Sequence, residues 1–303
     1  MIRINGALLS FLFFLPTLSP SLLSRVEVVS FPSRGLTLHG VLYKPEGMGP
    51  FPAVLYNHGS AAGMLSKEAF ETLGPLFARH GWVFFGPYRR GQGLSASAGP
   101  YIGDEIAAAI KTGGIPAGAA TMVRLLETDH LNDQLAALAW LRTQSFVKPD
   151  QIAVAGNSFG GIEAVLGAER APYCAAIDAS GAAESWAQTP GVQALMTRAV
   201  RNSQAPIFFF QAENDYDLSP SRSLSPAMKD AGKEFEIKIY PPFGKSGKTV
   251  IPSPIWEPPY GMVTCSGFWT SIAASRPTPW VENSPPNLDL LFQASQSQPN
   301  DTK

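Results

Sequence analysis

The chain has 303 residues, of which 45% are hydrophobic and 16% are charged, with a formal net charge of -1. This length and hydrophobic content suffice for one large domain with a full core. Lysine and arginine are scattered and form no basic stripe, so we expect no nucleic-acid partner. The two cysteines do not have the spacing of a metal site, and we expect no metal and no organic cofactor.

Residues 1–24 have the three parts of a secretory signal. Arg3 precedes an apolar run, residues 7–15, and a stretch rich in serine, threonine and proline follows it. The run is too short to span a bilayer, so no stable membrane span is expected. The segment predicts secretion or export to the periplasm; the alternative is a mis-assigned start codon and a cytoplasmic protein.

From residue 25 onward the chain alternates between strand and helix patterns. Segments 26–31 and 36–43 predict an antiparallel hairpin with its turn at 33–35. The alternation that follows is typical of a mostly parallel sheet covered by helices on both faces. The further expected strands are 52–57, 82–86, 151–155, 174–179, 206–211 and 235–240. The expected helices are 67–80, 162–170, 192–202 and 221–232, and a further helix that Asp129 caps and that ends before Lys148.

Residues 96–128 interrupt this alternation. They are rich in glycine and alanine and contain one short helical pattern, near residues 104–111. A segment of this length outside the regular pattern is either a lid over a site or a surface loop. We favour a small lid.

Residues 156–161, Gly-Asn-Ser-Phe-Gly-Gly, predict a nucleophile elbow between a strand and a helix. In such an elbow the serine lies on a strained turn, and small residues two positions before and after it let the two backbones approach closely. Gly156 and Gly160 occupy those positions. Ser158 would lie at a helix N-terminus, which stabilises developing negative charge. Ser158 is therefore the candidate nucleophile, and the alternative is a turn with a capping serine.

A second cluster of polar residues follows the strand expected at 206–211. Glu213, Asp215 and Asp217 lie in one loop at the carboxyl end of that strand. In open parallel sheets this is the edge where sites form.

Four motifs in order resemble the α/β-hydrolase fold, and within it the dienelactone hydrolase family. They are His58-Gly59 after one strand, Arg-Arg-Gly-Gln-Gly-Leu-Ser at 89–95 after the next, the elbow, and the Glu-Asn-Asp loop at 213–215. The resemblance covers residues 26–243 and implies one α/β-hydrolase domain over residues 25–246. It implies a serine hydrolase that acts on a small-molecule carboxylic ester or lactone by acyl transfer.

The resemblance also implies roles for individual residues. Ser158 and Asp215 match the nucleophile and the acid, with Asp217 as the runner-up acid. Backbone N–H groups of Phe159 and of Ser60 or Ala61 would form the oxyanion hole. His58 would brace its own loop through side-chain hydrogen bonds, and segments 96–128 and 184–199 would shape the acyl pocket.

The histidine that should follow the acid is missing. The four histidines of the chain are His39, His58, His80 and His130, and all precede Asp215. His80 and His130 lie at helix ends in the predicted pattern, which favours surface or cap positions for both. Because a serine needs a base to remove its proton, the alternative is a catalytically inactive protein with a hydrolase fold.

The C-terminal segment offers an explanation for this loss. After Gly244 the periodicity ends, and no final amphipathic helix is present to cover the last strands. Lys248 to Pro252 can be written with the codons AAG ACG GTC ATT CCT, and these nucleotides read two bases later encode Asp-Gly-His-Ser. We therefore predict that residues 247–303 are a frameshifted translation, from a sequencing error or a decayed gene.

Overall fold

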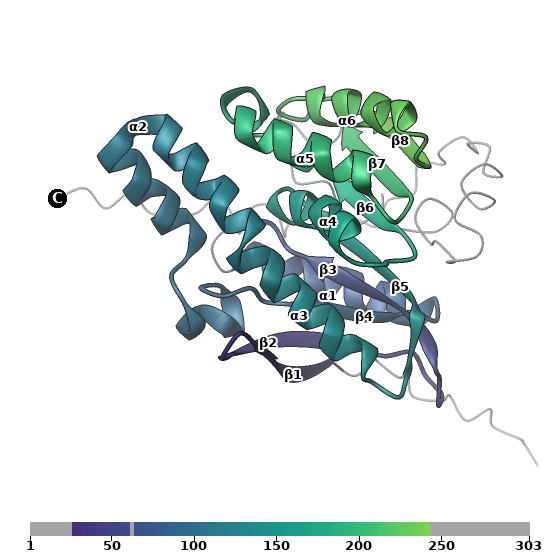
Figure 1. Cartoon of the computed structure of the whole chain (residues 1–303). Helices are drawn as coiled ribbons and strands as arrows, with labels where there is room; N and C mark the ends of the chain where they lie inside the picture. The colour runs from purple at the N-terminus through teal and green to yellow at the C-terminus, as the bar shows by residue number, and fades with distance from the viewer. Residues whose placement is uncertain (1–25, 61–63, 243–303) are drawn as a thin grey trace, which may run out of the picture.

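The computed structural model describes residues 26–60 and 64–242 (Figure 1). The predicted signal sequence (1–24), Ala61 and the predicted frameshifted segment (247–303) lie outside this part of the chain.

The described part contains one sheet of eight strands in the order β1-β2-β4-β3-β5-β6-β7-β8. β1 and β2 pair as an antiparallel hairpin, β2 pairs antiparallel with β4, and the strands from β4 to β8 are parallel. The strands are β1 (Val26–Ser33), β2 (Leu36–Tyr43), β3 (Phe51–Asn57), β4 (Val83–Pro87), β5 (Val147–Asn157), β6 (Ala176–Ala179), β7 (Ile207–Ala212) and β8 (Phe235–Tyr240).

Helices cover the two faces of the sheet unequally. α3, α4, α5 and α6 pack on one face, where a large apolar cluster joins them to the strands. In the described part of the chain the opposite face is covered by α1, whose aromatic residues pack on Phe84 and Tyr56. The helices are α1 (Met64–Arg79), α2 (Ile102–Glu127), α3 (Asp129–Arg142), α4 (Phe159–Arg170), α5 (Pro190–Asn202) and α6 (Ser219–Asp230), with short 3₁₀ turns η1 (Gly93–Ala98) and η2 (Trp186–Gln188).

Most predicted elements are present, but some of their ends differ from the predicted ones. β5 begins at Val147, four residues before the predicted start, although Pro149 lies within it. Asp129 is the first residue of α3 and does not cap it, because Thr128 occupies the N-cap position. The predicted cap was therefore wrong.

The segment 96–128 is far more helical than expected. α2 runs through 26 residues, with a break at Gly114, whose φ of 71° and ψ of -172° are not helical. Among the described residues, one helical stretch, Ile102–Arg142, is long and apolar enough by composition to cross a membrane, with a mean hydropathy of 1.2 over 18 residues. Length and composition alone do not show a span, and the expectation of none stays a prediction.

Candidate active site

Ser158 lies at the tip of the turn between β5 and α4. Its φ of 54° and ψ of -119° are outside the regions that residues with a side chain normally occupy. The side chain is half-buried, so the hydroxyl is not enclosed in the core. The strained turn expected from the motif is present.

The glycines around Ser158 are required by close backbone contacts. A Cβ atom on Gly156 would collide with the carbonyl of Gly160. A Cβ atom on Gly160 would collide with the carbonyls of Asn57 and His58 at the end of β3. The elbow therefore packs directly on the loop that follows β3, which brings the two motifs together.

That loop, residues 57–60, supplies the candidate oxyanion hole. A Cβ atom on Gly59 would lie 3.8 Å from the Ser158 Cβ, so the loop passes beside the serine. Phe159 is the first residue of α4, and its backbone N–H has no acceptor within the helix. Ser60 is the last residue described before the gap at 61–63. The structure thus places Phe159 next to Ser158 at the start of α4 and brings Gly59, the residue before Ser60, beside Ser158 from the loop after β3.

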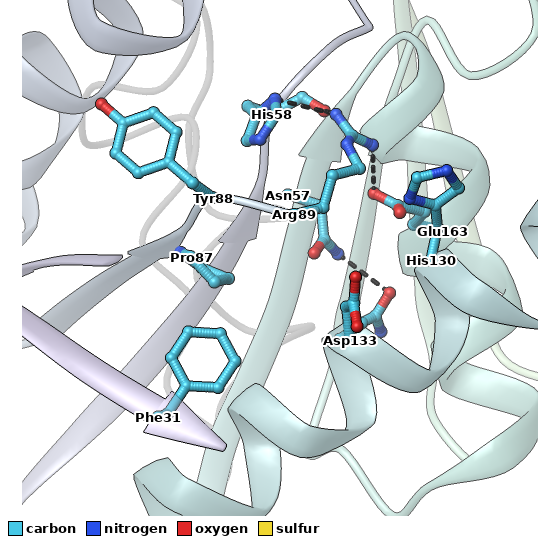
Figure 2. Close-up of a pocket in the computed structure, with 10 residues that line it drawn as sticks. Phe31, Asn57, His58, Pro87, Tyr88, Arg89, His130, Asp133 and Glu163 are labelled. Atoms are coloured by element: carbon cyan, nitrogen blue, oxygen red, sulfur yellow. Dashed lines mark hydrogen bonds and ion pairs between the residues drawn. The ribbon is translucent and has the colours of Figure 1, made fainter. Parts of the chain in front are cut away.

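A buried arginine holds the carbonyl groups of this loop (Figure 2). Arg89 donates through Nη2 to the carbonyls of His58 and, at 2.6 Å, of Gly59, and through Nη1 to Glu163 Oε2 at 2.7 Å. Gln92 Nε2 and the Tyr101 hydroxyl group both donate to the Ser60 carbonyl, at 3.2 and 2.6 Å. These donors fix the direction of three successive peptide groups. A fixed loop of this kind is what a preorganised oxyanion hole requires.

His58 contributes to the same bracing. Its Nδ1 lies 2.7 Å from the Gly59 carbonyl and 2.8 Å from Arg89 Nη2. The side chain is buried, and this burial, together with the charge of Arg89, holds the pKa of His58 well below its usual range. The position agrees with the bracing role implied by the resemblance.

The ion pair between Arg89 and Glu163 was not predicted from the sequence. Both side chains are at least 95% buried. Burial raises the pKa of the Glu163 carboxyl to about 7, although Arg89 acts in the opposite direction. Glu163 lies on α4 one turn after Ser158, so the pair joins the elbow helix to the oxyanion loop. The sequence signal that could have indicated this ion pair is a glutamate within the apolar pattern of the helix.

His130 is the second residue of α3, at a helix start as predicted, but it is buried beneath the elbow and the predicted surface exposure was wrong. Its ring packs edge-on against Phe159 at 5.7 Å and lies beside Glu163 in Figure 2. No hydrogen-bond partner for either ring nitrogen is found among residues 26–60 and 64–242. Burial, with the charges of Arg89 and Arg90, lowers the His130 pKa to about 2. Close packing of α3 on α4 places this side chain inside.

Asp215 lies at the same edge of the sheet as Ser158. β6 pairs with β5 at Asn157 and with β7 at Phe210, so the ends of β5 and β7 are two strands, about 10 Å, apart. Asp215 Oδ2 accepts a hydrogen bond from Gln211 Nε2 at 2.9 Å, and its Oδ1 accepts one from the Tyr216 N–H at 2.8 Å. The carboxylate is therefore oriented by its own loop.

The neighbouring acids have other partners. Asp217 Oδ1 accepts a hydrogen bond from the Ser219 N–H at 2.8 Å, at the start of α6. Asp178, on β6 between the two site loops, was not singled out from the sequence; its Oδ1 accepts a bond from the Gly181 N–H at 2.7 Å. Burial raises the pKa of Asp178 to about 7, and the charge of Asp215 adds to this rise. The role of Asp215 as the acid stays a prediction.

The sheet thus carries a strained serine after β5 and a carboxylate after β7. A comparison of the sequence with known families shows to which family the chain belongs. The sequence model of the dienelactone hydrolase family matches residues 38–246. The chain belongs to the dienelactone hydrolase family. This family assignment, predicted from four motifs, is confirmed, and a hydrolase type of enzyme follows from it.

Solved structures place this family member in the α/β-hydrolase fold, as expected. An acylaminoacyl peptidase from Pyrococcus horikoshii is similar with a TM-score of 0.53 and 19% identity, over 74% of this chain and 37% of that protein. A protein from Klebsiella pneumoniae assigned to the dienelactone hydrolases has a TM-score of 0.52 and 18% identity, over 72% and 86% of the two chains. A puromycin-hydrolyzing peptidase from Mycobacterium tuberculosis has a TM-score of 0.55 and 16% identity, over 72% and 35%. The chain thus spans little more than a third of the two peptidases. No curated protein sequence matches it significantly.

Proposed function

We propose that this family member is built as a serine hydrolase for carboxylic esters or lactones, with Ser158 as its nucleophile. The observation that carries the proposal is the strained conformation of Ser158, with Gly59 packed beside it. The hydroxyl oxygen would attack the substrate carbonyl carbon, and backbone donors at Phe159 and at Ser60 or Ala61 would stabilise the oxyanion. The alcohol would leave as the acyl-enzyme ester forms, and water would then release the acid.

The proton of Ser158 needs a base, and the histidines present are unsuitable. His58 and His130 are buried with pKa values far below neutrality, so they cannot accept a proton at neutral pH in this position. His39 Nδ1 is bonded to the Ser30 hydroxyl, and His80 is exposed at the end of α1. The missing base would be the histidine of the alternative reading frame after β8, oriented by Asp215.

A second candidate function follows from the same observation. The chain as printed lacks this base, so we also propose that in this form it is a catalytically inactive hydrolase-fold protein. The two proposals concern two states of one sequence, the restored frame and the present frame.

Hydrolysis of a short p-nitrophenyl ester by four proteins tests both. They are the printed chain, a version with the alternative frame restored from codon 247, and Ser158→Ala in each. We expect activity in the restored chain alone, reduced by at least about a thousandfold by Ser158→Ala. A p-nitroanilide substrate of the same acyl group separates ester from amide hydrolysis.

Equal activity in the printed chain and its Ser158→Ala variant would show that other groups hydrolyse the ester. Activity in the printed chain that needs Ser158 would contradict the inactive state and the frameshift prediction. A folded restored chain without activity would contradict Ser158 as the nucleophile.

A further inference from the structure

α2 forms a helical arm at the edge of the molecule. Its two halves meet at Gly114 and pack against each other, because Gly118 leaves room for the side chain of Ile110. Figure 1 shows this α2 arm, residues 102–127, extending away from the sheet beside α3 and α5. Its buried residues lie near its base, at Ile102, Leu125 and Leu126, and at Gly118 between the halves.

The outer part of the arm is apolar and exposed. Between Ile106 and Val123, Lys111 is the one charged residue. Ile110 and Ile115 are 42% and 61% exposed, respectively. A helix that is apolar on all sides is normally buried in a core or in lipid. Ile106, Met122 and Val123 pack on the core at the base of the arm, whereas residues 110–116 at its tip are exposed in the described part of the chain.

We propose that the tip of the α2 arm, residues 107–116, docks into the surface of a lipid bilayer. The tip carries the positive charge of Lys111 and no acid, which fits anionic headgroups. The acids of the arm, Asp104, Glu105 and Glu127, lie at its base, where Glu105 pairs with Arg124 at 3.6 Å and Glu127 with Arg198 at 2.8 Å. The apolar side chains at the tip would enter the acyl boundary, while Lys111 reaches back to the headgroups.

The length of the arm favours docking in one leaflet over a span. Each half has about 12 residues and rises about 18 Å, whereas the hydrocarbon core is about 30 Å thick. An open groove of about 680 Å³ lies between the second half of the arm and the start of α5, so apolar surface continues from the tip toward the body. Gly191 and Val123 meet in this groove, where a Cβ on Gly191 would lie 3.0 Å from Val123 Cγ2.

Vesicle binding by the full printed chain tests the proposal. The vesicles are phosphatidylcholine with a minor fraction of phosphatidylglycerol, and the readout is the amount of protein that sediments with them. Ile110→Gln/Ile115→Gln should lower the partition coefficient about tenfold or more, because two apolar anchors are lost. The matched control, Val28→Gln/Met48→Gln, removes two apolar side chains of 65% and 96% exposure far from the arm and should bind like the parent.

A second variant reports insertion directly. Ile115→Trp should show a blue shift of the added tryptophan emission when vesicles are present, and far-UV circular dichroism checks that each variant is folded. Ser158→Ala should bind vesicles like the parent, so this proposal and the proposed function fail independently. Lack of sedimentation by the folded parent, or equal loss in the control pair, would overturn it. A different result would also overturn it: no vesicle binding, together with a dimer in lipid-free size-exclusion chromatography that the arm variant disrupts and the control pair does not. That result would assign the arm to contact with a second copy of the chain.

Discussion

Ser158 illustrates how a strained residue is held in place by its neighbours. A serine at φ 54° costs on the order of 1–3 kcal/mol relative to a relaxed conformation. Its N–H donates to the Ala179 carbonyl at 2.9 Å, and its carbonyl accepts bonds from Gly161 and Ile162 at the start of α4. These bonds fix the backbone on both sides, so the side chain alone remains free to face the loop of residues 57–60.

His130 should make the protein sensitive to acid. Its pKa is about 2 in the folded state and near 6.5 when unfolded, so its contribution to stability is complete above pH 6.5 and is lost as the pH falls toward 2. At about pH 5 the loss is roughly 2 kcal/mol. His130→Phe, which keeps the ring contact with Phe159, should remove this part of the pH dependence. Urea unfolding at about pH 7.5 and pH 5 measures it.

The matched control for this prediction is His80→Phe. His80 is exposed at the end of α1, so its replacement should leave the pH dependence of the unfolding free energy unchanged. An identical acid response in parent and His130→Phe would show that other groups cause it.

Residues of the site differ in how far local sequence reveals them. Ser158 was predictable because the glycine spacing around it is a local requirement of the turn. His130 and Glu163 were not, because their burial depends on the packing of α3 on α4, and a histidine near a helix start resembles a surface residue when tertiary contacts are unknown. The partner of a buried charge, such as Arg89 for Glu163, is likewise fixed only by the fold.

At the scale of elements, the segment from β4 to α2 acts as a support for the loop after β3. Arg89 follows β4, Gln92 precedes η1 and Tyr101 precedes α2, and all three donate to carbonyls of residues 58–60. The glycine-rich run at 89–95, one of the four motifs of the resemblance, lies in this segment. The hydrogen bonds show that this run supports the loop after β3.

Removing one partner of the Arg89–Glu163 pair should be costly. Arg89→Met leaves Glu163 buried without its partner and should lower the free energy of unfolding by about 3–5 kcal/mol. The double variant Arg89→Met/Glu163→Met should recover part of this loss, which gives a large coupling energy in a double-mutant cycle measured by urea unfolding.

A surface ion pair provides the control for this cycle. Lys44 and Glu27 are 2.7 Å apart, and their side chains are 33% and 36% exposed. Their coupling energy should be below about 1 kcal/mol. Equal couplings for the two pairs would contradict a special role for the buried one.

The elements themselves were predicted unevenly, for a physical reason. Strands β3, β4, β6 and β7 are largely buried on both faces and therefore form continuous apolar runs that are easy to recognise in the sequence. α2 was missed because Gly113, Gly114 and Pro116 interrupt its pattern, although they allow two helical halves to meet at the tip of the arm. Glycine and proline mark a break, but they do not tell whether helix continues beyond it.

For the whole molecule, the family match ends at residue 246, one residue before the segment predicted to be frameshifted. In the described part of the chain, α1 alone packs on the second face of the sheet, and β8 is the last strand, ending at Tyr240. The alternative frame would supply a histidine after β8, in the run Asp-Gly-His-Ser. One change of frame would thus account for the missing catalytic histidine.

Covalent labelling of Ser158 tests the central claim most directly. The restored chain and the printed chain are treated with a fluorophosphonate, which reacts with activated serines, and the modified peptide is identified by mass spectrometry. The account predicts a stoichiometric label on Ser158 in the restored chain, none in its Ser158→Ala variant, and little in the printed chain. A label on another serine, or none in a restored chain that is folded, would contradict it.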